Sequence, residues 1–289
     1  MTAPATPAAA RVVDVHYHAG PDVYRRRGSC RQAAAEYARA DGWVVLKSHL
    51  TSTAAAAWEA RAEGLPVSGS VVLNESAGGV DPRVVEQAVH VHGADTPARL
   101  VVHLPTLTGP AHRSSLRREL FHPSFDPEVR RGPGVCDGEG RLRPQVCEVI
   151  LAARDLPVVL ATGHCTRHEA QLLVDEAART SLPRLLLTHA THPMSGWTPE
   201  ELSALRDVPG LYVEVTALTL LAGHHGPDTL AAAARHHPRV VFSSDLGQPD
   251  QPTPAQWLRL SRDWFAQAGL TPTQTRALTH DNPAGLLAL

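Results

Sequence analysis

The stretch VVDVHYHAG, residues Val12–Gly20, decides how this sequence is interpreted. Its alternation predicts a β-strand with Asp14, His16 and His18 on one face and apolar side chains on the other. Imidazole nitrogens are good ligands for zinc and similar divalent ions, and a buried row of polar groups without partners would be costly. The motif therefore favours a metal site at the end of a strand. Two hydrogen-bonded core histidines are the alternative, because an HxH motif is short enough to recur by chance.

Apolar runs rich in Val, Leu and Ile recur along the chain and predict seven further strands. They cover 43–46, 67–73, 100–104, 158–161, 185–187, 211–215 and 240–242. Helical patterns separate them at 32–40, 54–63, 82–91, 145–154, 167–179, 199–205 and 229–236. Alternating strands and helices indicate a parallel sheet, and eight such units favour a closed (β/α)8 barrel of the TIM type. A doubly wound open sheet is the alternative. We expect one barrel domain over residues 11–289, preceded by a flexible Ala/Pro-rich lead over residues 1–10.

One connection is long: residues 106–144, after the fourth strand, are rich in Pro, Gly and Arg. Long loops in compact domains are usually functional or disordered. In a barrel this loop would lie over the mouth, where His112 is a candidate substrate contact. A solvated insertion is the alternative.

Polar residues end three of the predicted strands. His164 follows the fifth strand, His189 follows the sixth and Asp245 follows the eighth. Because the carboxyl ends of barrel strands meet at one rim, we expect these side chains to join His16 and His18. His192 competes with His189, since the Thr-His dipeptide occurs twice, but His189 directly ends the apolar run.

This layout resembles the amidohydrolase superfamily, whose members carry HxH on the first strand, histidines on the fifth and sixth, and an aspartate on the eighth. The ending NPAGLLAL, residues 282–289, is similar to a common ending of that superfamily. The chain looks most like an uncharacterised branch, on motifs that here read Lys47-Ser48-His49, Leu73-Asn74 with Gly78-Gly79, Thr162-Gly163-His164 and Ser244-Asp245-Leu246-Gly247-Gln248. The resemblance implies a metal-dependent hydrolase with His16, His18, His164, His189 and Asp245 as ligands of one or two divalent ions, most readily zinc.

The sequence departs from the binuclear members, which bridge two ions with a carboxylated lysine or a glutamate on the fourth strand. The fourth strand here reads LVVHLP and has neither. Lys47, in a chain with almost no lysine, and Glu75 are the candidates for a bridge, and a desolvated Lys47 amine could take up carbon dioxide. A cationic anchor for substrate is the alternative role for Lys47.

Further roles follow from residue chemistry. Asp245 suits a general base, because a carboxylate beside the ion can accept the proton of water and pass it to the leaving group. Arg25, Arg26 or Arg27 could reach an anionic group of the substrate, and Arg25 is our candidate. Asp14 is expected to orient the first-strand ligands, or else to be a buried structural acid.

We therefore predict hydrolysis of an amide, lactone or ester bond in a small, anionic molecule by activated water. A metal-dependent decarboxylase or other lyase is the main alternative, because one fold hosts many reactions. A phosphoesterase that begins with HxH is a third. Such an enzyme is expected to end with Asp-x-His, whereas here Asp245 is followed by Leu246-Gly247-Gln248. A catalytically silent small-molecule receptor is the fourth.

Composition limits the partners. The 289 residues are 43% hydrophobic and 19% charged, with a net charge of -2, which argues against nucleic-acid binding and a membrane-surface role. The four cysteines have no zinc-knuckle spacing and are too few for a disulfide scaffold, so we expect reduced thiols in the cytoplasm. No apolar run approaches the roughly 20 residues of a membrane helix. A small-molecule substrate is the expected partner, and assembly into a homo-oligomer stays open.

Overall fold

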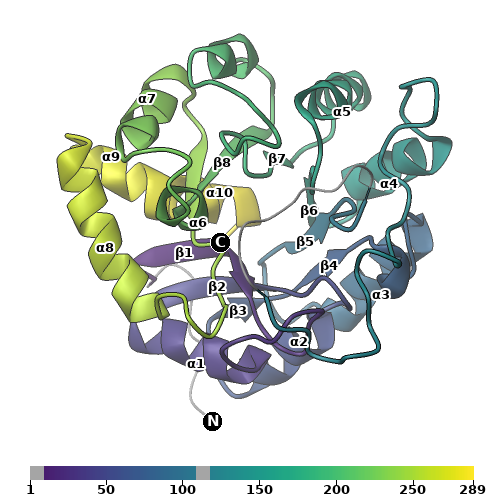
Figure 1. Ribbon diagram of the computed structural model, residues 1–289, viewed down its shortest axis with the longest axis horizontal. Helices are drawn as coiled ribbons and strands as arrows, with labels where there is room; N and C mark the ends of the chain where they lie inside the picture. The colour runs from purple at the N-terminus through teal and green to yellow at the C-terminus, as the bar shows by residue number, and fades with distance from the viewer. Residues whose placement is uncertain (1–9, 109–117) are drawn as a thin grey trace.

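The computed structural model describes residues 10–108 and 118–289 and shows strands enclosed by helices (Figure 1). All strands pair in parallel, in two sheets of order β1-β2-β3 and β4-β5-β6-β7-β8-β9. The strands are β1 (Val12–His18), β2 (Gly42–Lys47), β3 (Val67–Ser68), β4 (Ser70–Val72), β5 (Leu100–His103), β6 (Val158–Ala161), β7 (Leu185–Leu187), β8 (Leu211–Thr216) and β9 (Val240–Ser243).

The two sheets are connected at both edges. Only Gly69 separates β3 from β4, so the segment 67–72 pairs with β2 on one side and β5 on the other. A Cβ on Gly69 would lie 2.8 Å from Ala54 Cα, which explains why glycine occupies this break. At the opposite edge, Asp245 N–H donates to His16 O and His18 N–H donates to Leu246 O, both at 2.8 Å. Eight strand segments thus form a TIM-type (β/α)8 barrel, as the sequence predicts.

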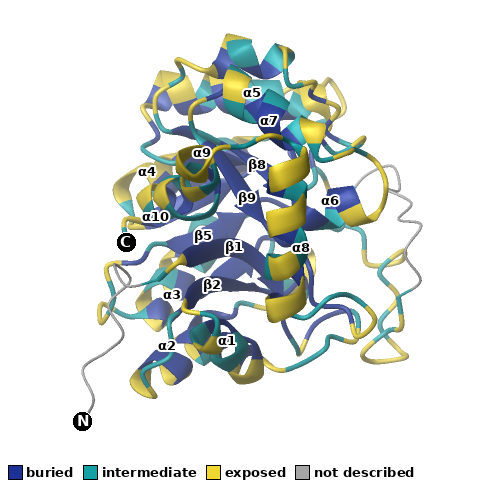
Figure 2. Cartoon of the chain, turned by 90° about the vertical axis from the view of Figure 1, so that its left-hand side faces the viewer, coloured by how far each residue is buried: buried dark blue, intermediate teal, exposed yellow. Residues whose placement is uncertain are grey.

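Helices lie around the strands, and their outward faces are exposed while the strands are buried (Figure 2). Most predicted helices form within a few residues of their expected ends, but the one expected at 199–205 is a short 3-10 turn, η3 (Glu201–Leu205). The helices that alternate with the strands are α1 (Cys30–Arg39), α2 (Ala54–Ala62), α3 (Pro82–His92), α4 (Pro144–Asp155), α5 (Arg167–Thr180), α6 (Ala217–Leu221) and α7 (Asp228–His236). After β9 come α8 (Pro254–Gln267), α9 (Pro272–Arg276), the π-helical turn η4 (Ala277–Asp281) and α10 (Asn282–Leu287).

Two apolar clusters divide the core. The larger one packs the outer faces of the strands against the helices. The smaller one lies inside the barrel, where Val13 and Val15 pack with Trp43 and with Leu286 and Leu287 of α10. The C-terminal helix therefore fills the amino-terminal end of the barrel, and the carboxyl end is left for polar side chains.

A bulge in β1 corrects one detail of the predicted alternation. The pairing of β1 with β2 shifts by one residue between Asp14 and Tyr17. Val15 therefore packs inside the barrel, whereas Asp14 points outward and accepts a hydrogen bond from the Tyr37 hydroxyl of α1. Asp14 does not share a face with His16 and His18, contrary to the expectation.

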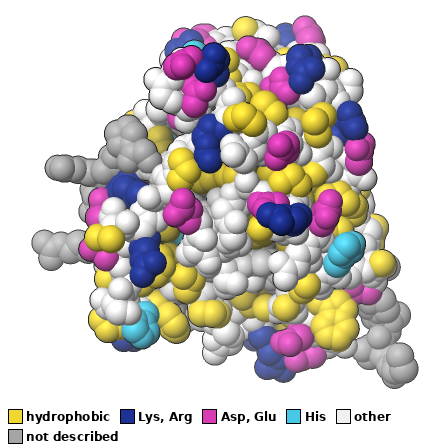
Figure 3. All heavy atoms as spheres, turned by 90° about the vertical axis from the view of Figure 1, so that its right-hand side faces the viewer, with side chains coloured by type: hydrophobic (Ala, Val, Ile, Leu, Met, Phe, Trp, Pro, Cys, Tyr) yellow, Lys and Arg dark blue, Asp and Glu magenta, His cyan; other side chains and the backbone are white. Residues whose placement is uncertain are grey.

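The surface is mixed in charge. On the face shown in Figure 3, arginine and acidic side chains are interspersed, and neither sign forms a broad patch there. Among the described residues, no helix has both the length and the apolar character needed to cross a bilayer.

Candidate metal centre

The first pair of predicted ligands meets the predicted acid at the carboxyl end of the barrel. His16 Nε2 lies 3.2 Å and His18 Nε2 lies 3.1 Å from Asp245 Oδ1. These three ligand atoms lie within 4.8 Å of one another, a spacing that suits one small ion. The hydrogen bonds between β1 and the segment after β9 bring these ligands together.

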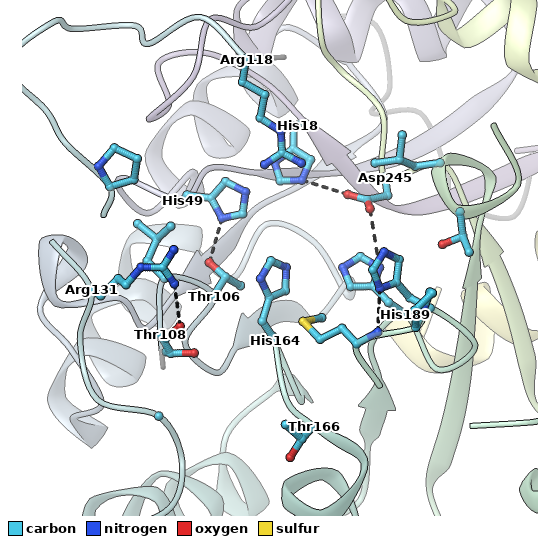
Figure 4. A pocket seen from close by; sticks show the side chains of 18 of the residues that line it. His18, His49, Thr106, Thr108, Arg118, Arg131, His164, Thr166, His189 and Asp245 are labelled. Carbon is cyan, nitrogen blue, oxygen red and sulfur yellow. Dashed lines mark hydrogen bonds and ion pairs between the residues drawn. The ribbon is translucent and has the colours of Figure 1, made fainter. Parts of the chain in front are cut away.

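His189 joins this group from the end of β7. Its Nδ1 lies 3.6 Å from Asp245 Oδ2, and its ring centroid is 5.0 Å from that of His16. Figure 4 shows His18 and His189 approaching Asp245 from different sides. His189 and Asp245 have left-handed backbones, with φ of 48° and 52°. Such conformations cost energy in residues other than glycine and often occur at functional sites.

His164 and His192 each lie near the His189 ring. The His164 ring centroid is 5.6 Å from that of His189 and 6.2 Å from that of His49. The His192 ring is 6.2 Å from that of His189 and packs edge-on against His224 at 4.9 Å. Neither residue belongs to the clusters of three possible ligands found among the described residues. His164 as a ligand therefore stays a prediction, and the geometry favours His189 over His192.

Glu214, which the sequence analysis missed, supports two of the histidines. Its Oε1 lies 3.0 Å from His16 Nδ1, and its Oε2 accepts the backbone N–H of His189 at 3.0 Å. Burial raises the pKa of Glu214, but the neighbouring His16 outweighs it and lowers the pKa to about 2. Glu214 is thus an ionised partner that directs His16 Nε2 toward Asp245. The alternation of Tyr212, Glu214 and Thr216 on β8 is the signal that could have found it.

His103 is a second residue that the sequence analysis did not select. It ends β5, is fully buried, and its ring centroid is 5.6 Å from that of His16. Neither ring nitrogen has a hydrogen-bond partner among the described residues. Burial lowers the pKa of His103 well below its ordinary value, so the ring is neutral.

Burial keeps His18 and His189 neutral, and the acid beside them is ionised. Burial lowers the pKa values of His18 and His189 to about 4. Burial raises the pKa of Asp245, but His16 and the hydrogen bond with His18 counteract it, and that pKa lies well below its ordinary value. Metal binding requires neutral imidazole and deprotonated carboxylate, and the shifted pKa values of His18, His189 and Asp245 favour these forms. The buried His189 Nδ1, which faces Asp245, has no hydrogen-bond partner in the described part, so the donor set fits a divalent ion such as zinc.

Lys47 lies next to the candidate ligand His16 and does not line the cavity. Its Nζ is 2.9 Å from His16 Nε2, and the residue is almost fully buried. Burial lowers the pKa of Lys47 to about 8. Lys47 is the only lysine in the chain. Glu75, the other candidate bridge, is exposed at the start of the 3-10 turn η2 (Glu75–Ala77).

Asp14 accepts hydrogen bonds from backbone N–H groups and not from imidazole rings. Its Oδ1 accepts the backbone N–H groups of His16 and Ser244, both at 3.0 Å. Asp14 therefore ties the bulged strand to the residue that precedes Asp245, which supports the ligands indirectly.

A cavity of about 1200 Å³ opens above the cluster. His18, His189 and Asp245 line its floor, and the loop after β5 contributes Arg118 and Arg131 to its wall, as expected for a loop over the barrel mouth.

Arg25, the expected substrate contact, does not line this cavity, and its Nε pairs with Glu119 Oε1 at 2.8 Å. Its neighbour Arg26 lines the cavity instead. His112 lies outside the described residues.

Comparison with solved structures defines the fold. An amidohydrolase from Pseudomonas aeruginosa matches with 13% identity, 98% of this chain, 100% of that chain and a TM-score of 0.58. An amidohydrolase from Burkholderia multivorans with bound zinc matches with 16% identity, 96% and 99% coverage and a TM-score of 0.57. A 2,6-dihydroxybenzoate decarboxylase from Rhizobium matches with 11% identity, 95% and 98% coverage and a TM-score of 0.53. The fold is therefore the amidohydrolase barrel that the sequence resemblance implies.

The sequence family of this chain is a narrower group than the proteins that share its fold. Residues 11–214 match a family of unknown function, DUF6282, and the chain belongs to that family. No curated protein matches the sequence.

Proposed function

We propose that this protein is a metal-dependent hydrolase of an amide, lactone or ester bond in a small anionic molecule. The observation that carries the proposal is the meeting of His16, His18, His189 and Asp245 beneath a cavity of about 1200 Å³. A divalent ion bound there, most readily zinc for this donor set, supplies a water of lowered pKa and polarises a carbonyl.

Asp245 is the residue placed to move the proton. It is ionised, contacts both first-strand histidines and lines the cavity. In the proposed reaction its carboxylate accepts a proton from the attacking water and returns it to the leaving group. His16 and His189 are held by Glu214, so the geometry around Asp245 is preset before substrate arrives.

Decarboxylation of an aromatic acid is the second candidate. It is supported by the similarity to the Rhizobium decarboxylase and by His103 on β5, where binuclear hydrolases are expected to carry a bridging lysine or glutamate. The reaction differs in its products, because decarboxylation releases carbon dioxide and consumes no water.

The four cysteines are free in the structure, which supports our proposal of a cytoplasmic protein with reduced thiols. A homo-oligomer remains part of the proposal, to be tested by measuring the mass in solution.

Product analysis tests the reaction. The zinc-loaded protein is offered a panel of carboxylate-bearing esters, lactones and amides, together with hydroxybenzoic acids, in oxygen-labelled water. The proposal predicts label in the new carboxylate product, and a loss of about 100-fold or more in kcat for Asp245→Asn when it is compared with the wild type at equal zinc content. Release of carbon dioxide with no label in the organic product would establish the second candidate, and no turnover by zinc-loaded protein would contradict both.

A further inference from the structure

A buried ion pair lies beside the metal centre and is not required by the proposed proton transfer. Arg26 Nε and Nη2 each lie 2.6 Å from Asp22 Oδ2. The Arg26 side chain is 3% exposed and Asp22 is fully buried. Removing two charges from water is costly, and a buried pair often adds little stability, so a functional role for this pair is favoured.

Asp22 is saturated with donors. In addition to Arg26, its Oδ1 accepts the backbone N–H groups of Val23 at 2.7 Å and His49 at 2.6 Å, and the Ser48 hydroxyl at 3.3 Å. Burial raises the pKa of Asp22, but the adjacent Arg26 charge counteracts it, and that pKa lies far below its ordinary value. Asp22 therefore fixes the position and orientation of the guanidinium.

The guanidinium has one edge left for a ligand. Asp22 takes Nε and Nη2 of Arg26, whereas Nη1 has no hydrogen bond within the described residues. Arg26 lines the cavity together with His18 and His49. A planar, pre-positioned guanidinium is well suited to a carboxylate.

His49 offers a second polar group next to Arg26. Its Nδ1 lies 2.8 Å from the Thr106 hydroxyl, which also receives a hydrogen bond from the Asn74 amide at 3.0 Å. Its ring stacks on His18, with centroids 4.7 Å apart (Figure 4). Because Nδ1 is occupied by Thr106, Nε2 is the ring nitrogen left for a ligand, and burial keeps the ring neutral by lowering its pKa.

We propose that Arg26 and His49, positioned by Asp22, form a carboxylate-binding subsite next to the metal centre. The subsite lies next to the metal ligand His18, whose Nδ1 is 3.7 Å from Asp22 Oδ2. A small molecule whose carboxylate binds there extends over His18 toward Asp245. This inference rests on the proposed function and narrows its substrate class to carboxylic acids.

Benzoate is the probe, with benzamide as its neutral counterpart, and binding to zinc-loaded protein is measured by calorimetry. The inference predicts that Arg26→Gln weakens benzoate binding by about tenfold or more without changing zinc content or benzamide binding. Arg25→Gln, at the position first expected from sequence, and Arg31→Gln, on the exposed face of α1, should both bind benzoate like the wild type.

A double variant separates loss of the subsite from misfolding of the protein. Arg26→Gln leaves Asp22 buried without its partner, so Asp22→Asn with Arg26→Gln removes both charges and should show the same loss of benzoate binding. Two results would overturn the inference: zinc-loaded wild type that binds no benzoate at millimolar concentrations, or an Arg26→Gln variant that binds it undiminished. Failure to bind zinc at all would instead count against the proposed function.

Discussion

The His16 imidazole and the Glu214 carboxylate form a fully buried pair, with 3.0 Å between Nδ1 and Oε1. The pair joins β1 to β8, two strands far apart in sequence, and leaves His16 Nε2 facing Asp245 and Lys47. A carboxylate behind a metal-binding imidazole fixes the ring and raises its basicity. We therefore expect Glu214 to matter for metal binding as much as the ligands themselves.

Glu214→Gln should therefore weaken zinc binding by about 10-fold to 100-fold, because the neutral amide orients His16 less firmly and removes a buried negative charge. The measurement is a zinc titration against a competing chelator. Glu148→Gln, at an exposed position of α4, is the matched control and should bind zinc like the wild type. Unchanged affinity in Glu214→Gln would remove Glu214 from the account.

Lys47→Met should reduce kcat by about tenfold or more, equivalent to about 1.4 kcal/mol, because it removes the buried cation 2.9 Å from His16. The melting temperature should not fall, since burial of a lysine is itself costly and Met fills a similar volume. Activity and thermal unfolding are measured on the same preparation. Full activity would assign Lys47 a structural role only, and a large drop in melting temperature would point the same way.

Gly247→Ala should lower both the melting temperature and the zinc affinity. Gly247 has φ of +130°, and a Cβ there would lie 2.0 Å from the His18 carbonyl oxygen. The backbone that carries His18 must then move. Gly223→Ala is the control, because Gly223 also has positive φ, at +72°, but a Cβ would meet nothing within 4 Å. Equal effects of the two substitutions would mean that backbone strain alone, and not contact with His18, is responsible.

His92 provides a pH-dependent test outside the site. Its Nε2 accepts the Gly69 N–H at 3.2 Å, and burial together with the Arg61 charge lowers its pKa to about 4. Between pH 6.5 and 4 the unfolded chain binds the extra proton, so the free energy of unfolding falls as pH decreases, by up to about 1.4 kcal/mol per pH unit. His92→Gln keeps an acceptor but cannot titrate, so its pH dependence should be shallower. Parallel curves for the two proteins would contradict this assignment.

Much of the barrel could be predicted from sequence because parallel strands are buried on both faces and stand out as short apolar runs. His18 could be selected from the HxH motif, and His189 and Asp245 could be selected because they come at the ends of such runs. The elements after β9 are harder to predict, since the sequence does not reveal that Leu286 and Leu287 turn inward to fill one end of the barrel.

The bulge in β1 and the residues inside the barrel required the structure. Strict alternation assigns Asp14 to the face of His16, and only the register shift shows that Asp14 points to Tyr37 instead. Glu214 and His103 are single polar residues within apolar strands, so they resemble ordinary strand residues until their neighbours are known. The choice between Arg25 and Arg26 depends on one backbone turn, which the sequence does not specify.

Zinc content tests the central claim most directly. The wild type, purified without chelators and supplied with zinc, should hold the ion through dialysis, whereas His16→Ala with His18→Ala should lose it while its circular dichroism stays that of the wild type. Elemental analysis of both proteins gives the answer. Full zinc occupancy in the double variant, or none in the wild type, would contradict the assignment of this cluster as a metal centre.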